Sequence, residues 1–215
     1  KQNCYRLLRL VNNLVDMTKL DSGYMNLSFV NYEIVSLVED ITLSIIPYVE
    51  SKNINVLFDT YIEELEIKCD PESIERVILN LLSNAVKFTN NNGNIFVLMD
   101  ADDDYVTIRI KDDGVGVSEE VQEEIFKRFV QEDKSLNRKK EGSGIGLALV
   151  KSLVELHNGQ VYLEKGIEKG SEFVVKLPNV RIENKEENDN KIIDVENKPL
   201  VQKIHIEFSD IYELY

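Results

Sequence analysis

The sequence predicts an α+β fold, a two-layer sandwich in which helices cover one face of a mixed sheet, preceded by one long helix. Strand-like segments with alternating apolar residues and helix-like segments with apolar residues three and four apart occur in a mixed order. Of the 215 residues, 43% are hydrophobic, which is enough to bury a full core. We expect one main domain over residues 24–179.

The N-terminal segment, residues 1–23, is expected to be helical up to about residue 20. The apolar positions that recur three and four apart are Cys4, Leu7, Val11 and Leu14. This pattern is typical of a helix in a bundle or coiled coil, although an ordinary docking helix would show it too. Because the pattern is already running at the first residue, without a start methionine, we expect the chain to be part of a longer protein.

The first half of the main domain should begin with a short strand and then contain two further strands and two long helices. The expected ranges are a strand at 25–29, a helix at 34–51, strands at 54–61 and 66–69, and a helix at 71–88. The last of these helices has the clearest start, because Asp70 is a good N-cap and Pro71 suits the first helical turn.

The second half should contain a hairpin, two helices and two final strands. The expected ranges are strands at 95–100 and 105–111, a short helix from Ser118 to about 129, a buried helix at 145–156, and strands at 160–164 and 171–177. The stretch 131–143 between the helices is polar and has no periodicity, so we expect a mobile loop.

The C-terminal tail has two parts. Residues 180–199 are rich in charge and Asn and indicate a linker. In residues 200–215, the alternation of Ile204, Ile206 and Phe208 predicts a strand that adds to a sheet edge or docks on a neighbouring molecule. A disordered extension is the alternative.

Charge and composition narrow the possible partners. The net charge is −14 and the pI about 4.7, which disfavours nucleic acid as a partner. A nucleotide site in such a chain would need locally concentrated cations. Cys4 and Cys69 lack disulfide or metal spacing and indicate reduced thiols, so we expect a cytoplasmic location. No apolar run approaches a membrane span, and we expect no membrane contact by this chain.

Three motifs carry candidate chemistry, and the first lies on the helix at 71–88. Asn80, Asn84 and Lys87 share one stripe beside the apolar face, because positions i, i+4 and i+7 fall together. Amide oxygens suit a hard cation and an ammonium suits phosphate. A solvated helix face is the alternative.

The second motif is Asp112-Asp113-Gly114-Val115-Gly116, directly after a strand. A carboxylate at such a turn can accept from the adenine amino group. Guanine has a carbonyl there, so the pairing would favour ATP over GTP by roughly 2–4 kcal/mol. An ordinary glycine turn is the alternative.

The third motif is the glycine-rich run 142–146 before the buried helix. It would present backbone N–H groups and a helix N-terminus to phosphate. The preceding loop contains the cations Lys134, Arg138, Lys139 and Lys140. Solvated surface lysines are the alternative for each of them.

The order and spacing of these motifs resemble the nucleotide-binding boxes of sensor histidine kinases. The matching runs are NLLSNAVKFT at 80–89, DDGVGV at 112–117, IFKRF at 125–129, EGSGIGLALVKSLVELHNG at 141–159 and KGSEFVVKLP at 169–178. The resemblance covers about residues 25–178 and implies a Bergerat-type sandwich of the GHKL superfamily. Residues 1–23 look like the end of the second helix of the dimerisation and phosphotransfer domain.

The resemblance implies a role for each matched residue. Asn84 would ligate Mg²⁺, Asn80 would support the metal or phosphate site, and Lys87 would contact phosphate. Phe88 would pack by adenine or ribose, and Asp112 would accept from the adenine amino group. Gly114 and Gly116 would let the backbone close on the base. Phe126 and Phe129 would anchor the base of the ATP lid, to which Lys134, Arg138 and Lys140 belong. The phosphate-facing turn would comprise Gly142, Ser143, Gly144, Ile145, Gly146 and Leu147.

The residue at position 80 bears on the reaction. Related ATPases of the superfamily carry a Glu there as the general base for water, whereas this chain has Asn80. An amide cannot take that proton, which favours phosphoryl transfer over hydrolysis. The implied function is transfer of the γ-phosphate of Mg-ATP to a histidine, for relay to a response-regulator receiver domain.

The phosphoacceptor motif of the family is absent from this chain. Its two histidines are His157, at the end of the buried helix, and His205, in the tail, and we expect neither to be phosphorylated. The intact kinase would be a homodimer. An anti-sigma-type serine kinase or a non-catalytic ATP-binding module of the same superfamily is the alternative.

Overall fold

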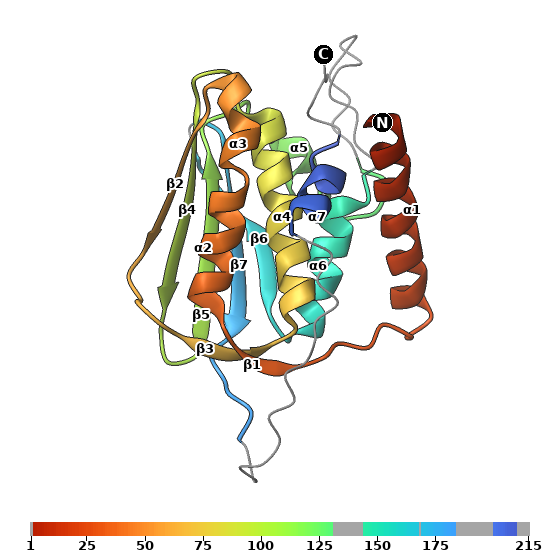
Figure 1. Ribbon diagram of the computed structural model, residues 1–215, viewed down its shortest axis with the longest axis vertical. Helices are drawn as coiled ribbons and strands as arrows, with labels where there is room; N and C mark the ends of the chain where they lie inside the picture. Colours follow the sequence, from red (N-terminus) through yellow and green to blue (C-terminus); the bar gives the residue numbers. More distant parts are fainter. Residues whose placement is uncertain (1, 131–143, 168, 184–199, 210–215) are drawn as a thin grey trace.

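The computed structural model describes residues 2–130, 144–167, 169–183 and 200–209, and it confirms the α+β sandwich (Figure 1). The main sheet has the order β2-β4-β5-β7-β6, with β2 parallel to β4 and the other neighbours antiparallel. Its strands are β2 (Asn55–Thr60), β4 (Asn94–Ala101), β5 (Tyr105–Asp112), β7 (Ser171–Pro178) and β6 (Gln160–Leu163). Helices α2 (Ile34–Ser44), α4 (Pro71–Phe88) and α6 (Gly146–Leu156) cover one face of this sheet, and the core lies between the two layers.

A second, two-stranded sheet closes one end of the sandwich. It pairs β1 (Val30–Glu33) with β3 (Glu66–Cys69), in a register that sets Val30 opposite Cys69. The predicted strand at 25–29 is therefore wrong, because pairing begins at Val30. The chain after β7 also stays attached here, since Lys68 N donates to Val180 O at 2.7 Å and Ile182 N donates to Asn31 Oδ1 at 2.7 Å. The first residues of the predicted linker, 180–182, are therefore attached to this second sheet.

Helix α4 has the predicted bounds, and its N-cap is confirmed. Asp70 Oδ1 accepts from Ser73 N at 3.0 Å, while Asp70 N donates to His157 Nε2 at 3.0 Å. His157 follows the last residue of α6, and its Nδ1 lies 2.7 Å from Leu153 O. Burial lowers the pKa of His157, although its hydrogen bond to Leu153 opposes that shift. A neutral imidazole therefore fastens the end of α6 to the start of α4.

The predicted helix at 34–51 is divided into three pieces. They are α2, α3 (Ile46–Val49) and the 3₁₀ helix η1 (Glu50–Lys52). Pro47 explains the break after α2, because proline has no N–H to continue the ladder to Leu43 O. Glu33 caps the start of α2, and its carboxylate accepts from the backbone N–H of Val35, Ser36 and Leu65.

The predicted helix from Ser118 to about 129 is shorter than expected. Helix α5 spans only Glu119–Gln122, and the Ser118 side chain makes no cap hydrogen bond. Ile125 and Phe126 instead pack against the core, so tertiary packing ends the helix early.

The predicted C-terminal strand is wrong, because Leu200–Glu207 forms a helix, α7. Ile204, Glu207 and Phe208 are buried and lie three and four positions apart, which is the period of a helix face. Figure 1 shows α7 between α4 and the N-terminal helix α1 (Gln2–Asp21). In the described ranges no helix combines the length and the apolar character that a membrane span needs.

Candidate active site

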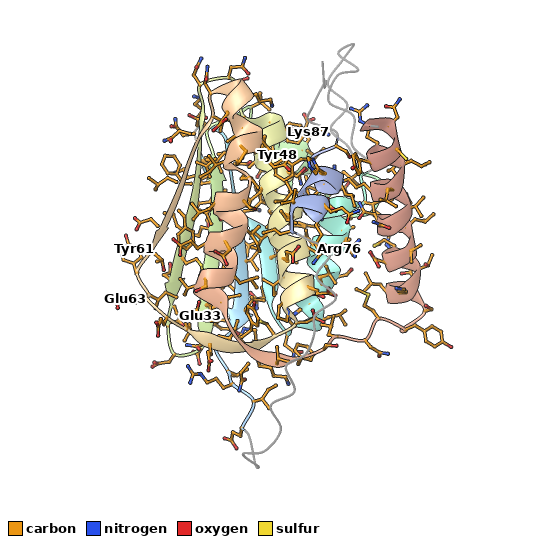
Figure 2. All side chains as sticks on the ribbon, viewed as in Figure 1. Glu33, Tyr48, Tyr61, Glu63, Arg76 and Lys87 are labelled. Atoms are coloured by element: carbon orange, nitrogen blue, oxygen red, sulfur yellow. The ribbon has the colours of Figure 1, made fainter. Side chains whose placement is uncertain are left out.

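The candidate site begins on the stripe of α4 that carries two amides and an ammonium. Asn80 is buried, whereas Asn84 and Lys87 are partly buried. Lys87 Nζ lies 5.3 Å from the centroid of the Phe88 ring. Figure 2 shows Lys87 near one end of α4 and Arg76, on the same helix, toward α1. The predicted stripe is therefore continuous from the buried middle of α4 to its accessible C-terminal end.

The amide of Asn80 is aimed at the start of α6. Asn80 Nδ2 donates to Arg76 O at 3.1 Å, and Oδ1 is buried without a hydrogen-bond partner in the described structure. A Cβ at position 146 would lie 2.7 Å from this oxygen, so a larger residue there would have to displace the Asn80 amide. Ile145, the residue before α6, has an apolar side chain and makes no side-chain cap hydrogen bond. The Asn80 acceptor and the N-terminus of α6 thus lie side by side, the first suited to a cation and the second to an anion.

Asp112 is held rigidly at the end of β5. Its side chain is buried, Ser171 Oγ donates to Oδ2 at 2.5 Å, and Gly114 N donates to Oδ1 at 2.9 Å. Burial raises the pKa of Asp112, and the hydrogen bonds from Ser171 and Gly114 oppose that rise. Each carboxyl oxygen has a second lone pair, so the group can still accept from a ligand.

The turn after Asp112 is made of backbone packed against backbone. A Cβ on Gly114 would lie 2.4 Å from Phe88 O, and one on Gly170 would lie 1.8 Å from Asp112 O. Gly116 has a φ of 72°, which is in the left-handed region. A hollow of about 260 Å³ lies beside this turn, lined by Gly114, Gly116, Gln122, Leu163, Lys169 and Ser171 among others. The glycines therefore let the turn close on the end of α4 and leave space next to it.

Asp113 fixes this turn to the neighbouring strand. Its Oδ1 accepts from Asn94 N and its Oδ2 from Asn94 Nδ2, both at 2.9 Å. The hydrogen bond from the Asn94 backbone is the main cause that lowers the pKa of Asp113, and burial opposes it. The two adjacent carboxylates thus differ in role: Asp113 anchors the turn and Asp112 is available to a ligand.

The base of the predicted lid is closed by Phe129 and Gly144. Phe129 N donates to Gly144 O at 2.8 Å, and a Cβ on Gly144 would lie 2.8 Å from Phe129 Cα. Phe126 packs edge-on against Phe173 in the core, whereas Phe129 is 71% exposed. The predicted residues Lys134, Arg138, Lys139, Lys140, Gly142 and Ser143 lie outside the described residues.

This geometry agrees with a match to a known family. The model described as "Histidine kinase-, DNA gyrase B-, and HSP90-like ATPase" matches residues 69–181. The chain belongs to this ATPase family. The match begins one residue before the N-cap of α4 and ends beyond β7, so it contains every site residue described above.

The relatives of this ATPase domain include sensor and hybrid histidine kinases. Histidine kinase P4 of Formosa agariphila is 36% identical over 178 residues, covering 80% of this chain and 13% of P4. Circadian input-output histidine kinase CikA of Synechococcus elongatus is 32% identical over 174 residues, covering 80% of this chain and 23% of CikA. The chain therefore spans less than a quarter of the length of either relative.

Solved structures give the same fold. Full-length ShkA in complex with AMPPNP aligns with a TM-score of 0.73 and 28% identity, over 83% of this chain and 37% of ShkA. The catalytic domain of histidine kinase ThkA aligns with a TM-score of 0.63 and 24% identity, over 73% of this chain and all of that domain.

Most of the predicted site residues in the described ranges come together. Asn80 meets Gly146, and Asp112 and Gly114 meet the end of α4 at Phe88. Ile145 is buried at the start of α6, and Leu147 packs against the core. The sequence reading gave no role to Ser171, Gly170 or Asn94. Ser171 and Gly170 lie in the run KGSEF, and their position in a glycine motif could have indicated a role in the site.

Proposed function

We propose that this chain is the ATP-binding catalytic part of a histidine kinase, which transfers the γ-phosphate of ATP to a histidine outside this chain. The observation that carries the proposal is the buried Oδ1 of Asn80, which has no hydrogen-bond partner among the described residues and lies beside Gly146 at the N-terminus of α6. A buried acceptor without a partner is unfavourable unless a ligand satisfies it.

Adenine would bind at Asp112. The carboxyl group is oriented by Ser171 and Gly114, and its remaining lone pairs can accept from the exocyclic amino group. The O6 carbonyl of guanine would face the same acceptor and repel it, which favours ATP by roughly 2–4 kcal/mol. Phe88 and the turn of Gly114 and Gly116 would pack around the base.

Mg²⁺ would be held by Asn84 together with Asn80. Their amide oxygens are hard neutral donors of the kind that Mg²⁺ takes alongside phosphate, and the unpaired Asn80 Oδ1 fits this use. When bound, the ion neutralises phosphate charge. Lys87 at the end of the stripe would contact phosphate, and the N–H groups of Gly146 and Leu147 would face it.

The position of Asn80 favours transfer to an imidazole over hydrolysis. An amide cannot accept the proton of an attacking water near neutral pH, whereas a neutral imidazole is already nucleophilic. His157 does not serve as that nucleophile, because both of its ring nitrogens are engaged, with Asp70 and Leu153. His205 is exposed, and its ring contacts the rings of Tyr5 and Tyr48.

The exposed side of α1 would belong to the bundle that carries the acceptor histidine. Six apolar side chains on this helix are 41–61% exposed: Leu7, Leu8, Leu10, Val11, Leu14 and Val15. An exposed apolar face of this extent is typical of an interaction surface. We propose a homodimeric bundle as its partner in the intact protein, and a response-regulator receiver domain as the recipient of the phosphoryl group. The solved complex of ThkA with the response regulator TrrA shares this fold and supports the proposal by analogy.

The proposal is tested by incubating the chain with labelled ATP and a separately purified phosphoacceptor hairpin of a histidine kinase. We expect an acid-labile, base-stable label on the hairpin and none on this chain. An acid-stable label, or rapid release of inorganic phosphate without transfer, would refute it.

A further inference from the structure

Helix α7 lies C-terminal to the ATPase domain and packs against its core. It begins after the region matched by the ATPase family, which ends at residue 181. Ile204 is 1% exposed and Phe208 is fully buried. Lys203 Nζ lies 2.9 Å from Glu75 Oε2 of α4, and Ser83 Oγ of α4 donates to the Glu207 carbonyl at 3.0 Å. Helix α7 is therefore fixed to the helical layer by apolar and polar contacts.

Helix α7 also contacts α1, through Glu207, one turn after Lys203 on the same side of the helix. Arg9 Nε lies 2.9 Å from Glu207 Oε2 as an ion pair without the alignment of a hydrogen bond, and the two side chains are only 12% and 10% exposed. The rings of Tyr5 and His205 stack with centroids 6.0 Å apart. Because the ion pair is largely removed from water, loss of either charge removes a contact that water replaces poorly.

The other contacts between α1 and the domain are polar apart from Met17 and Leu20, which pack against the core. Asn13 and Asp16 are buried against the guanidinium of Arg76 on α4, and Asp21 pairs with Arg128 at the base of the lid. Met17 is the buried hydrophobic residue that α1 contributes to the core, while its larger apolar face is exposed. Interfaces of this polar kind within a chain are typical of parts that separate and re-associate.

We propose that α7 is a latch that holds α1 on the ATPase domain through the Arg9–Glu207 pair. The C-terminal helix thereby sets the balance between a state with α1 docked and a state with α1 released. Removing a contact made only in the docked state shifts that balance toward release. The consequence for phosphoryl transfer rests on the proposed function, because a domain held on α1 cannot change its position relative to the acceptor bundle.

Release of α1 can be measured with a thiol at position 17. The parent chain would carry Cys4→Ser, which removes the exposed thiol, and Met17→Cys, which places a thiol under the docked helix. Cys69 is fully buried in the core and reports global unfolding in the same reaction. The measured quantity is the labelling rate of each thiol by a soluble aromatic disulfide.

We expect Glu207→Gln to accelerate labelling at position 17 about tenfold or more without labelling Cys69, since a buried pair loses one charge. Arg9→Gln should act alike, and the exchanged pair Arg9→Glu with Glu207→Arg should return the rate toward that of the parent. Glu66→Gln is the matched control, because it removes a carboxylate from the exposed pair with Arg181, away from α1.

A chain ending at residue 199 is the second test, since it lacks α7 altogether and should label at least as fast as Glu207→Gln. Equal rates for the parent, Glu207→Gln and the shortened chain would overturn the latch. Labelling does not depend on nucleotide, so a chain that failed to bind ATP would refute the proposed function and leave this result unaffected.

Discussion

Because Gly146 lies beside the Asn80 side chain, Gly146→Ala should lower the stability of the protein when Asn80 is present and raise it when Asn80 is replaced by Ala. A methyl group at position 146 would lie 2.7 Å from the buried Asn80 Oδ1, and such overpacking costs about 1–3 kcal/mol. Alanine in place of glycine in a helix contributes about 0.5–1 kcal/mol in the other direction. Gly146→Ala should therefore destabilise the protein by up to about 2.5 kcal/mol. The same change in an Asn80→Ala background should stabilise it by up to about 1 kcal/mol.

Urea unfolding of the four proteins in this cycle measures the coupling, which we expect to be about 1–3 kcal/mol. Ser152→Ala, further along α6, is the control and should have the same effect in both backgrounds. If Gly146→Ala had the same effect with and without Asn80, the amide would not face the start of α6, and the assigned phosphate and metal site would lose its main support.

Three further outcomes follow from the site and from α6. Asp112→Asn should weaken ATP binding by about 1–3 kcal/mol because a charged acceptor is lost, and unchanged affinity in calorimetry would refute the placement of adenine. Asn84→Ala should abolish the magnesium dependence of ATP binding, and a variant that still needs the ion for tight binding would contradict its assignment. Because the pKa of His157 is lower in the folded protein, the unfolded chain binds a proton at this residue first as pH falls. The stability of the protein should therefore fall as pH drops below about 6.5, and it should fall less in His157→Gln. Parallel pH dependences in urea unfolding would show that His157 is not buried as a neutral ring.

Elements with strong local signals could be predicted from the sequence. Helix α4 has both predicted ends because Asp70 supplies a cap, Pro71 fits the first turn and the apolar stripe is long. The division of α2 and α3 at Pro47 was missed, although the reason is local, since proline lacks the N–H that a continuous helix needs.

Helix α7 could not be predicted from its own residues. Ile204, Ile206 and Phe208 satisfy the strand period, while Leu200, Ile204 and Phe208 satisfy the helix period, and a segment this short does not distinguish them. The distinction comes from distant residues, because Glu75 and Ser83 of α4 and Arg9 of α1 contact Lys203 and Glu207, which lie one turn apart on a helix. Tertiary contacts override local preference in such segments.

In the candidate site too, residues in local motifs could be predicted, whereas contacts between distant segments could not. Residues in compact motifs, such as Asn80, Asp112 and Gly146, were found because spacing places them on one helix stripe or in one turn. Ser171 and Asn94 were missed as partners of the two aspartates because their contacts join β5 to β7 and to the start of β4, and strand pairing decides those contacts.

Calorimetric titration of this chain with ATP and GTP, with and without Mg²⁺, measures whether Asp112 and the amides of α4 form an ATP site. We expect magnesium-dependent binding of ATP and weaker binding of GTP by roughly 2–4 kcal/mol. Equal affinity for the two nucleotides, or ATP binding that is indifferent to magnesium, would refute this site.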